Sequence, residues 1–270
     1  MKPRLMAALI IPVLCCACAP GVDVDPLLRD FDTYANDVRA AAADEESLKI
    51  LDIAGAKRAE AGALADEGKD KEAARVLERA MADARLAFEM EKMHASSHRA
   101  EKCRFEVDQA RVKWSEAVSI LEQVEESTGG KSDLEMREPV VVPAEPALPP
   151  STLASDSFPP VSLKVIHARW TAWRTVLNER KIAAADLETE YWHSYDRTDD
   201  EKKNPATAEH HLYLAARAAQ SLECRVRYEM NERVCLDATL QTAAFADARV
   251  DALRAALDLE RGLKDGRRKK

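Results

Sequence analysis

Residues 71–125 read KEAARVLERAMADARLAFEMEKMHASSHRAEKCRFEVDQARVKWSEAVSILEQVE, a run of 55 residues with neither proline nor glycine. The run is rich in Ala, Arg, Glu, Leu and Met, which lose little conformational freedom on entering a helix. It therefore predicts one continuous helix, roughly 80 Å long at about 1.5 Å per residue.

Apolar residues recur in the second half of this run at alternating steps of three and four. The positions are Ala100, Cys103, Val107, Ala110, Trp114, Ala117, Leu121 and Val124. Such a heptad seam is typical of helices that bury one narrow stripe against other helices. Neighbouring segments are therefore predicted to pack along this helix.

The segment before the long run is predicted to be helical and to pack antiparallel to it. Asp25-Pro26 predicts a helix start, with Asp25 as the cap and Pro26 in the first turn. A second start at Asp44 leaves open whether one helix or two precede the turn at Gly68.

The second half of the chain predicts a similar hairpin. Its first arm carries a heptad seam interrupted by Arg180, at Leu163, Ile166, Trp170, Trp173, Leu177, Ala184, Leu187 and Tyr191. Residues 206–261 again lack proline and glycine and predict a long final helix. The matching places of helices 71–125 and 206–261 indicate either a divergent duplication or similar composition alone.

A proline-rich segment separates these halves. Seven of the twelve prolines lie between Pro139 and Pro160, where extended polyproline-like backbone is favoured. The predicted fold is therefore all-α, with two long helical hairpins forming an elongated or coiled-coil-like bundle. The predicted parts are a signal peptide (1–17), a first hairpin (18–126), a linker (127–160) and a second hairpin with a basic tail (161–270).

The first 18 residues are typical of an export signal. Lys2 and Arg4 precede an apolar run over residues 6–14, which is too short to span a bilayer, and the small-residue cluster CCACAP follows. The cluster resembles a bacterial lipobox, which would place an acyl chain on Cys18, with Cys16 as the second choice. The alternative is an A-x-A site at residues 17–19, which would release a soluble secreted protein.

The stretch ALADEGKDKEAARVLERAMADARLAFE (63–89), behind this lipobox, resembles Ala-rich bacterial envelope lipoproteins built round a helical domain of unknown function. The resemblance covers about residues 54–125. It implies a lipid anchor in the outer membrane, facing the periplasm, because Ala19 rather than aspartate follows Cys18. It implies no catalytic residues.

Composition limits the partners. The formal net charge is -8, so most of the surface repels nucleic acid phosphates and no nucleic acid partner is expected. The 47 alanines and 5% aromatic residues predict thin helix interfaces rather than a large globular core. Only the tail over residues 267–270 is basic, and it is either solvated or touches anionic lipid or cell-wall polymer.

One helix face carries candidate metal ligands. His94 and His98 are four residues apart, with Glu91 and Glu101 one turn to either side. Imidazole and carboxylate groups at this spacing suit zinc or copper, but a solvated polar stripe explains them better and no metal site is expected. No phosphate-binding loop, Ser/His/Asp set or paired-carboxylate motif stands out, so neither a cofactor nor enzymatic activity is expected.

Three cysteines lie beyond the leader, at Cys103, Cys224 and Cys235. Cys224 and Cys235 are roughly 16 Å apart along a continuous helix, too far for a disulfide. Either of them can pair with Cys103 in an oxidising compartment, and the alternative is three buried free thiols.

These features favour a membrane-tethered helical scaffold of the cell envelope that binds other envelope proteins or the cell-wall polymer. The alternative is a periplasmic metal-binding protein or enzyme that uses the His94/His98 face.

Overall fold

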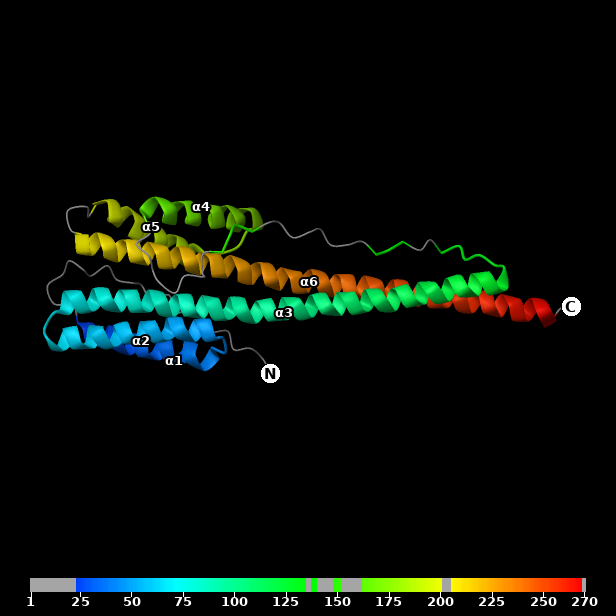
Figure 1. Cartoon of the computed structure of the whole chain (residues 1–270), viewed down its shortest axis with the longest axis horizontal. Coiled ribbons are helices and arrows are strands. Elements are labelled where there is room, and N and C mark those ends of the chain that lie inside the picture. The colour runs from blue at the N-terminus through cyan, green and yellow to red at the C-terminus, as the bar shows by residue number, and fades with distance from the viewer. Residues whose placement is uncertain (1–22, 135–136, 140–147, 152–161, 201–204, 269–270) are drawn as a thin grey trace. The chain divides into compact units, whose positions relative to one another are not determined.

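The computed structural model describes residues 23–134, 137–139, 148–151, 162–200 and 205–268. This part of the chain contains six helices and no strands, which confirms the all-α prediction (Figure 1). The leader and Cys18 lie outside the described residues, as does most of the proline-rich segment.

Two helices, not one, precede the first turn. Helix α1 spans Val24–Ala41 and α2 spans Glu45–Asp66. The side chain of Asp44 caps α2 by accepting a hydrogen bond from the Ser47 N–H at 2.8 Å, in the way that its sequence position predicts. The cap of α1 is Asp23 rather than Asp25, because the Asp23 carboxylate accepts the amide of Asp25 in the first turn.

Helix α3 is a single helix over Asp70–Thr128, three residues longer at its C-terminal end than predicted. Gly68, with φ 73°, provides the left-handed residue of the turn before it, and Gly129, with φ 66°, does so after it.

The second half also contains three helices. Helix α4 spans Leu163–Arg180, α5 spans Ala185–Asp200 and α6 spans Pro205–Arg268. Lys181 ends α4 in the left-handed conformation, with φ 54°, so the predicted first arm is broken into two helices. Helix α6 continues through Gly262, where the sequence suggested its end.

The described helices form two compact units. Unit 1 runs up to His94 and includes Leu148–Arg227, whereas unit 2 contains Ala95–Ala147 and the residues from Tyr228 onward. Helices α3 and α6 each contribute their first part to unit 1 and their second part to unit 2.

This division differs from the predicted hairpins over 18–126 and 161–270. Each unit combines both halves of the chain, because α3 pairs in parallel with α6 rather than only with its own hairpin partner. Asp83 meets Tyr213 in unit 1, and Cys103 meets Cys235 in unit 2. The chain therefore passes from one unit to the other within α3 and within α6 as well as in the proline-rich segment.

In unit 1, α3 lies between α2 and α6, and α4 and α5 pack beside α6 (Figure 1). One apolar core joins α1, α2 and α3 and includes Phe31, Leu51 and Leu77. Trp170 and Trp173 of α4 and Tyr191 of α5 are almost completely buried, as their positions on the predicted seam indicate. The Trp170 and Tyr191 rings stack with their centroids 4.0 Å apart.

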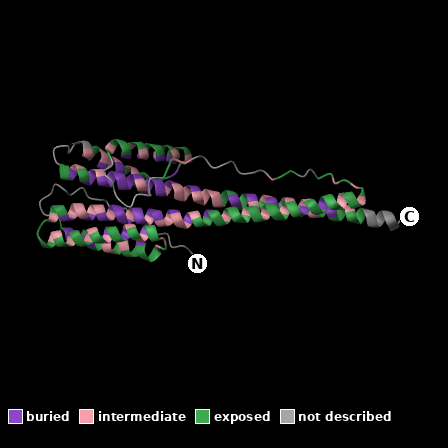
Figure 2. Cartoon of the chain, in the orientation of Figure 1, coloured by how far each residue is buried: buried purple, intermediate pink, exposed green. Residues whose placement is uncertain are grey.

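Unit 2 is built around the predicted heptad seam. All eight seam residues of α3, from Ala100 to Val124, are buried or half-buried, while most residues between them are exposed (Figure 2). Phe245 of α6 packs on Trp114, with ring centroids 5.7 Å apart. The spacing of three and four therefore identified the buried face of this part of α3.

Candidate functional sites

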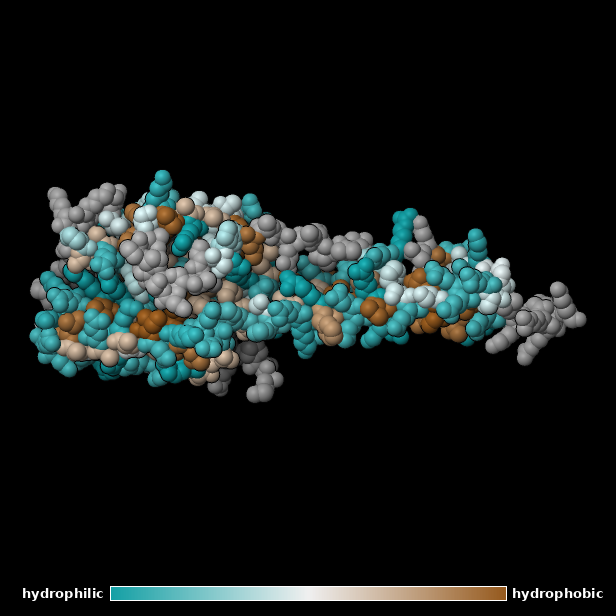
Figure 3. All heavy atoms as spheres, viewed as in Figure 1, coloured by the Kyte–Doolittle hydropathy of each residue, from teal (hydrophilic) through white to brown (hydrophobic). Residues whose placement is uncertain are grey.

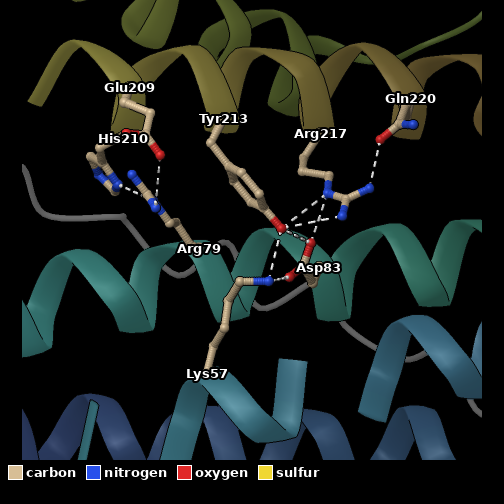
Figure 4. Close-up of polar contacts among 8 residues, drawn as sticks. All are labelled: Lys57, Arg79, Asp83, Glu209, His210, Tyr213, Arg217 and Gln220. Atoms are coloured by element: carbon tan, nitrogen blue, oxygen red, sulfur yellow. Dashed lines mark hydrogen bonds and ion pairs between the residues drawn. The ribbon is translucent and has the colours of Figure 1, made fainter. Parts of the chain in front are cut away.

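A buried polar cluster connects three helices of unit 1 (Figure 4). We define the Asp83 cluster as Lys57 of α2, Asp83 of α3, and Tyr213 and Arg217 of α6. Lys57 Nζ lies 2.6 Å from one carboxylate oxygen of Asp83, and Arg217 Nε lies 2.7 Å from the other. Tyr213 donates its hydroxyl to the Asp83 carboxylate at 2.5 Å and accepts from Lys57 at 3.0 Å.

The electrostatics of this cluster favour a fixed arrangement. The Asp83 side chain is fully buried and is neutralised by two cations. Burial raises the pKa of the Tyr213 hydroxyl, and the negative charge of Asp83 raises it further. The hydroxyl therefore stays protonated and can donate its hydrogen bond. Because these polar groups bind one another, the cluster is suited to holding α2, α3 and α6 together.

No residue of the Asp83 cluster was among the predicted site residues. The available signal was a charged residue inside an Ala-rich stripe, since Asp83 lies between Ala82 and Ala84, and Arg217 lies between Ala216 and Ala218. A lone charge flanked by small residues on a packing face requires a buried partner.

Further ion pairs in unit 1 also connect different helices. Arg225 of α6 makes a two-pronged contact with Glu89 of α3, at 2.8 and 2.5 Å, and this hydrogen bonding raises the pKa of the guanidinium. Arg85 of α3 pairs with Glu190 of α5. Burial raises the pKa of the Glu190 carboxyl, while Arg85 opposes that shift.

The four predicted metal ligands have separate surroundings. Glu91 accepts backbone N–H groups of Ala43 and Asp44, both at 3.0 Å. His94 instead faces two carboxylates near the start of α2. In unit 2, His98 is mostly exposed and lies 3.8 Å from Glu101.

The cysteines adopt one of the two pairings that their spacing left open. Cys103 of α3 and Cys235 of α6 form a disulfide with a Cα–Cα distance of 5.3 Å. Cys224 is a buried thiol beside Leu86, Met90 and Met93, and burial raises its pKa, so it is a poor nucleophile.

Unit 2 also exposes apolar side chains on the faces of both helices that point away from the seam. We define the outer face of α6 by its exposed apolar residues Leu236, Leu240, Ala243, Val250 and Leu257, four of which recur at seven-residue steps. The exposed charged residues Asp247 and Arg254 lie between them on the same face. Leu236 and Leu240 are 67% and 69% exposed. Phe105 and Val112 occupy the corresponding face of α3, and Figure 3 shows hydrophobic atoms among hydrophilic ones along this unit.

No family model matches the chain, and neither a curated protein nor a solved structure does. Within the described residues, no helix is both long and apolar enough to cross a membrane.

Proposed function

We propose that this chain is a lipid-anchored lipoprotein of the outer membrane, facing the periplasm, and that it is a non-catalytic scaffold for other envelope proteins. The main observation behind the scaffold role is the outer face of α6. An apolar stripe that repeats every seven residues on a helix surface suits the apolar stripe of another helix.

Three other features support this proposal. The leader and the lipobox at Cys18 fit an exported, acylated protein. A disulfide between Cys103 and Cys235 fits an oxidising compartment. The polar groups of the Asp83 cluster form contacts between helices, which fits a structural role. The apolar character of the outer face favours a protein partner over the cell-wall polymer.

The acyl anchor is expected to depend on Cys18. Metabolic labelling with a radioactive fatty acid should mark the wild-type protein, and Cys18→Ser should abolish both the label and membrane fractionation. The thiol is the acceptor of the acyl chain and serine does not replace it. Cys16→Ser is the matched control and should keep the label. Label retained in Cys18→Ser but lost in Cys16→Ser would move the anchor to Cys16.

The partner is expected to contact the outer face of α6. A photoreactive amino acid at Leu240 or Leu257 should form a discrete cross-linked product in intact cells. Asp237 and Arg249 are exposed positions on the same helix but off the apolar stripe, so the same substitution there should give little product. Equal yields at all four positions, or no product at any of them, would contradict a binding role for this face.

A further inference from the structure

Three side chains near the start of α2 converge on one point in unit 1. Asp44 caps α2, Glu46 lies in its first turn and His94 reaches them from α3. Each offers one ligand atom, and the three atoms lie within 4.8 Å of one another.

The spacing of these atoms fits an ion better than it fits hydrogen bonds. His94 Nε2 is 3.7 Å from Asp44 Oδ2 and 3.7 Å from Glu46 Oε2, beyond the range of a good hydrogen bond. This nitrogen is itself buried and has no hydrogen-bond partner in the described part of the chain. Ligand atoms bound to one zinc at 2.0–2.2 Å are separated by about 3.3–3.6 Å, so the His94 nitrogen already lies near this spacing from both oxygens.

The surrounding contacts hold one of the ligands, Asp44, in place. Ser47 donates its amide at 2.8 Å and its hydroxyl at 3.1 Å to the Asp44 carboxylate. The carboxylate of Glu91, one turn before His94, binds the backbone of Ala43 and Asp44 and so ties the α1–α2 loop to α3. Such supporting bonds orient metal ligands before the metal binds.

We propose that Asp44, Glu46 and His94 bind one divalent transition metal, with water completing its coordination. One imidazole and two carboxylates form a mixed nitrogen and oxygen set that suits zinc. Two carboxylate charges balance the ion, and the exposed side chain of Glu46 leaves it accessible from solvent. This set shares only His94 with the predicted one, since Glu91 binds the backbone of the α1–α2 loop and His98 lies beside Glu101.

Calorimetric titration tests the site, with zinc chloride added to the full chain after the protein has been stripped of metal by a chelator. The wild type should bind one zinc ion per chain. Asp44→Asn, Glu46→Gln and His94→Gln should each weaken binding at least tenfold. Asparagine caps helices about as well as aspartate, so Asp44→Asn removes the charge without removing the cap.

His98→Gln and Glu101→Gln are the matched controls, since they alter the neighbouring turns of the same helix and should bind zinc like the wild type. Absence of zinc binding by the wild type would overturn the proposal, because His94 would then make only ion pairs. Wild-type affinity in Glu46→Gln would also overturn it, and this exposed variant has no buried contact whose loss would unfold the protein.

Discussion

Asp83→Ala should lower the free energy of unfolding by about 3–5 kcal/mol, the cost typical of removing one partner from a buried ion pair. The substitution leaves Lys57 and Arg217 charged at a buried site without the carboxylate that neutralises them, and it removes the acceptor of the Tyr213 hydroxyl. Chemical denaturation followed by far-UV circular dichroism measures the loss.

Asp52→Ala is the control for this prediction. Asp52 pairs with Arg39 at 2.8 Å, but both side chains are exposed, so its removal should cost less than about 1 kcal/mol. In the triple variant Asp83→Leu, Lys57→Met and Arg217→Met, no buried charge of the cluster remains, and part of the lost stability should return. If Asp83→Ala costs no more than Asp52→Ala, the cluster does not hold the three helices together.

Removing the disulfide should destabilise unit 2 by about 2–5 kcal/mol. Cys103 and Cys235 are 132 residues apart in sequence, so the bond closes a long loop and greatly restricts the unfolded chain. The pair of helices in unit 2 has one narrow seam and little other core. Hydrogen exchange should therefore accelerate most over residues 95–128 and 228–262 in a Cys103→Ser, Cys235→Ser variant.

Treating the wild-type protein and the double variant with a reductant provides the control for this prediction. It should accelerate exchange in the wild-type protein to the level of the double variant, and it should leave the double variant unchanged. Cys224 is a free thiol in both proteins and so does not contribute to the difference. A wild-type protein whose exchange is insensitive to reductant, or whose peptide map links Cys103 to Cys224, would contradict the pairing.

Local residue preferences and residue spacing were enough to predict which residues form helices and which face of α3 is buried in unit 2. Helix formation along residues 71–125 depends on local backbone preferences and on the absence of proline and glycine. The seam from Ala100 to Val124 is buried because residues three and four apart share one side of a helix. The cap at Asp44 is equally local, since its carboxylate binds an amide only three residues away.

The break after Arg180 could not be predicted from the same pattern. Leu177 and Ala184 are seven residues apart, so the heptad spacing continues across the break, and both residues are buried. Lys181 occupies the left-handed position without the glycine that usually marks it. Periodicity therefore identified the buried residues of this segment but not the helix ends between them.

Which helices pair with one another, in contrast, is set by packing and cannot be derived from residue spacing. An Ala-rich stripe shows which face must be buried, but one such stripe fits another almost equally well, so it does not select a partner. In unit 1 the selection depends on charges that are more than a hundred residues apart, as Asp83 and Arg217 are. His94 likewise meets Asp44 and Glu46 across helices instead of Glu91 and His98 along its own, because side-chain contacts between helices are set by packing and not by sequence spacing.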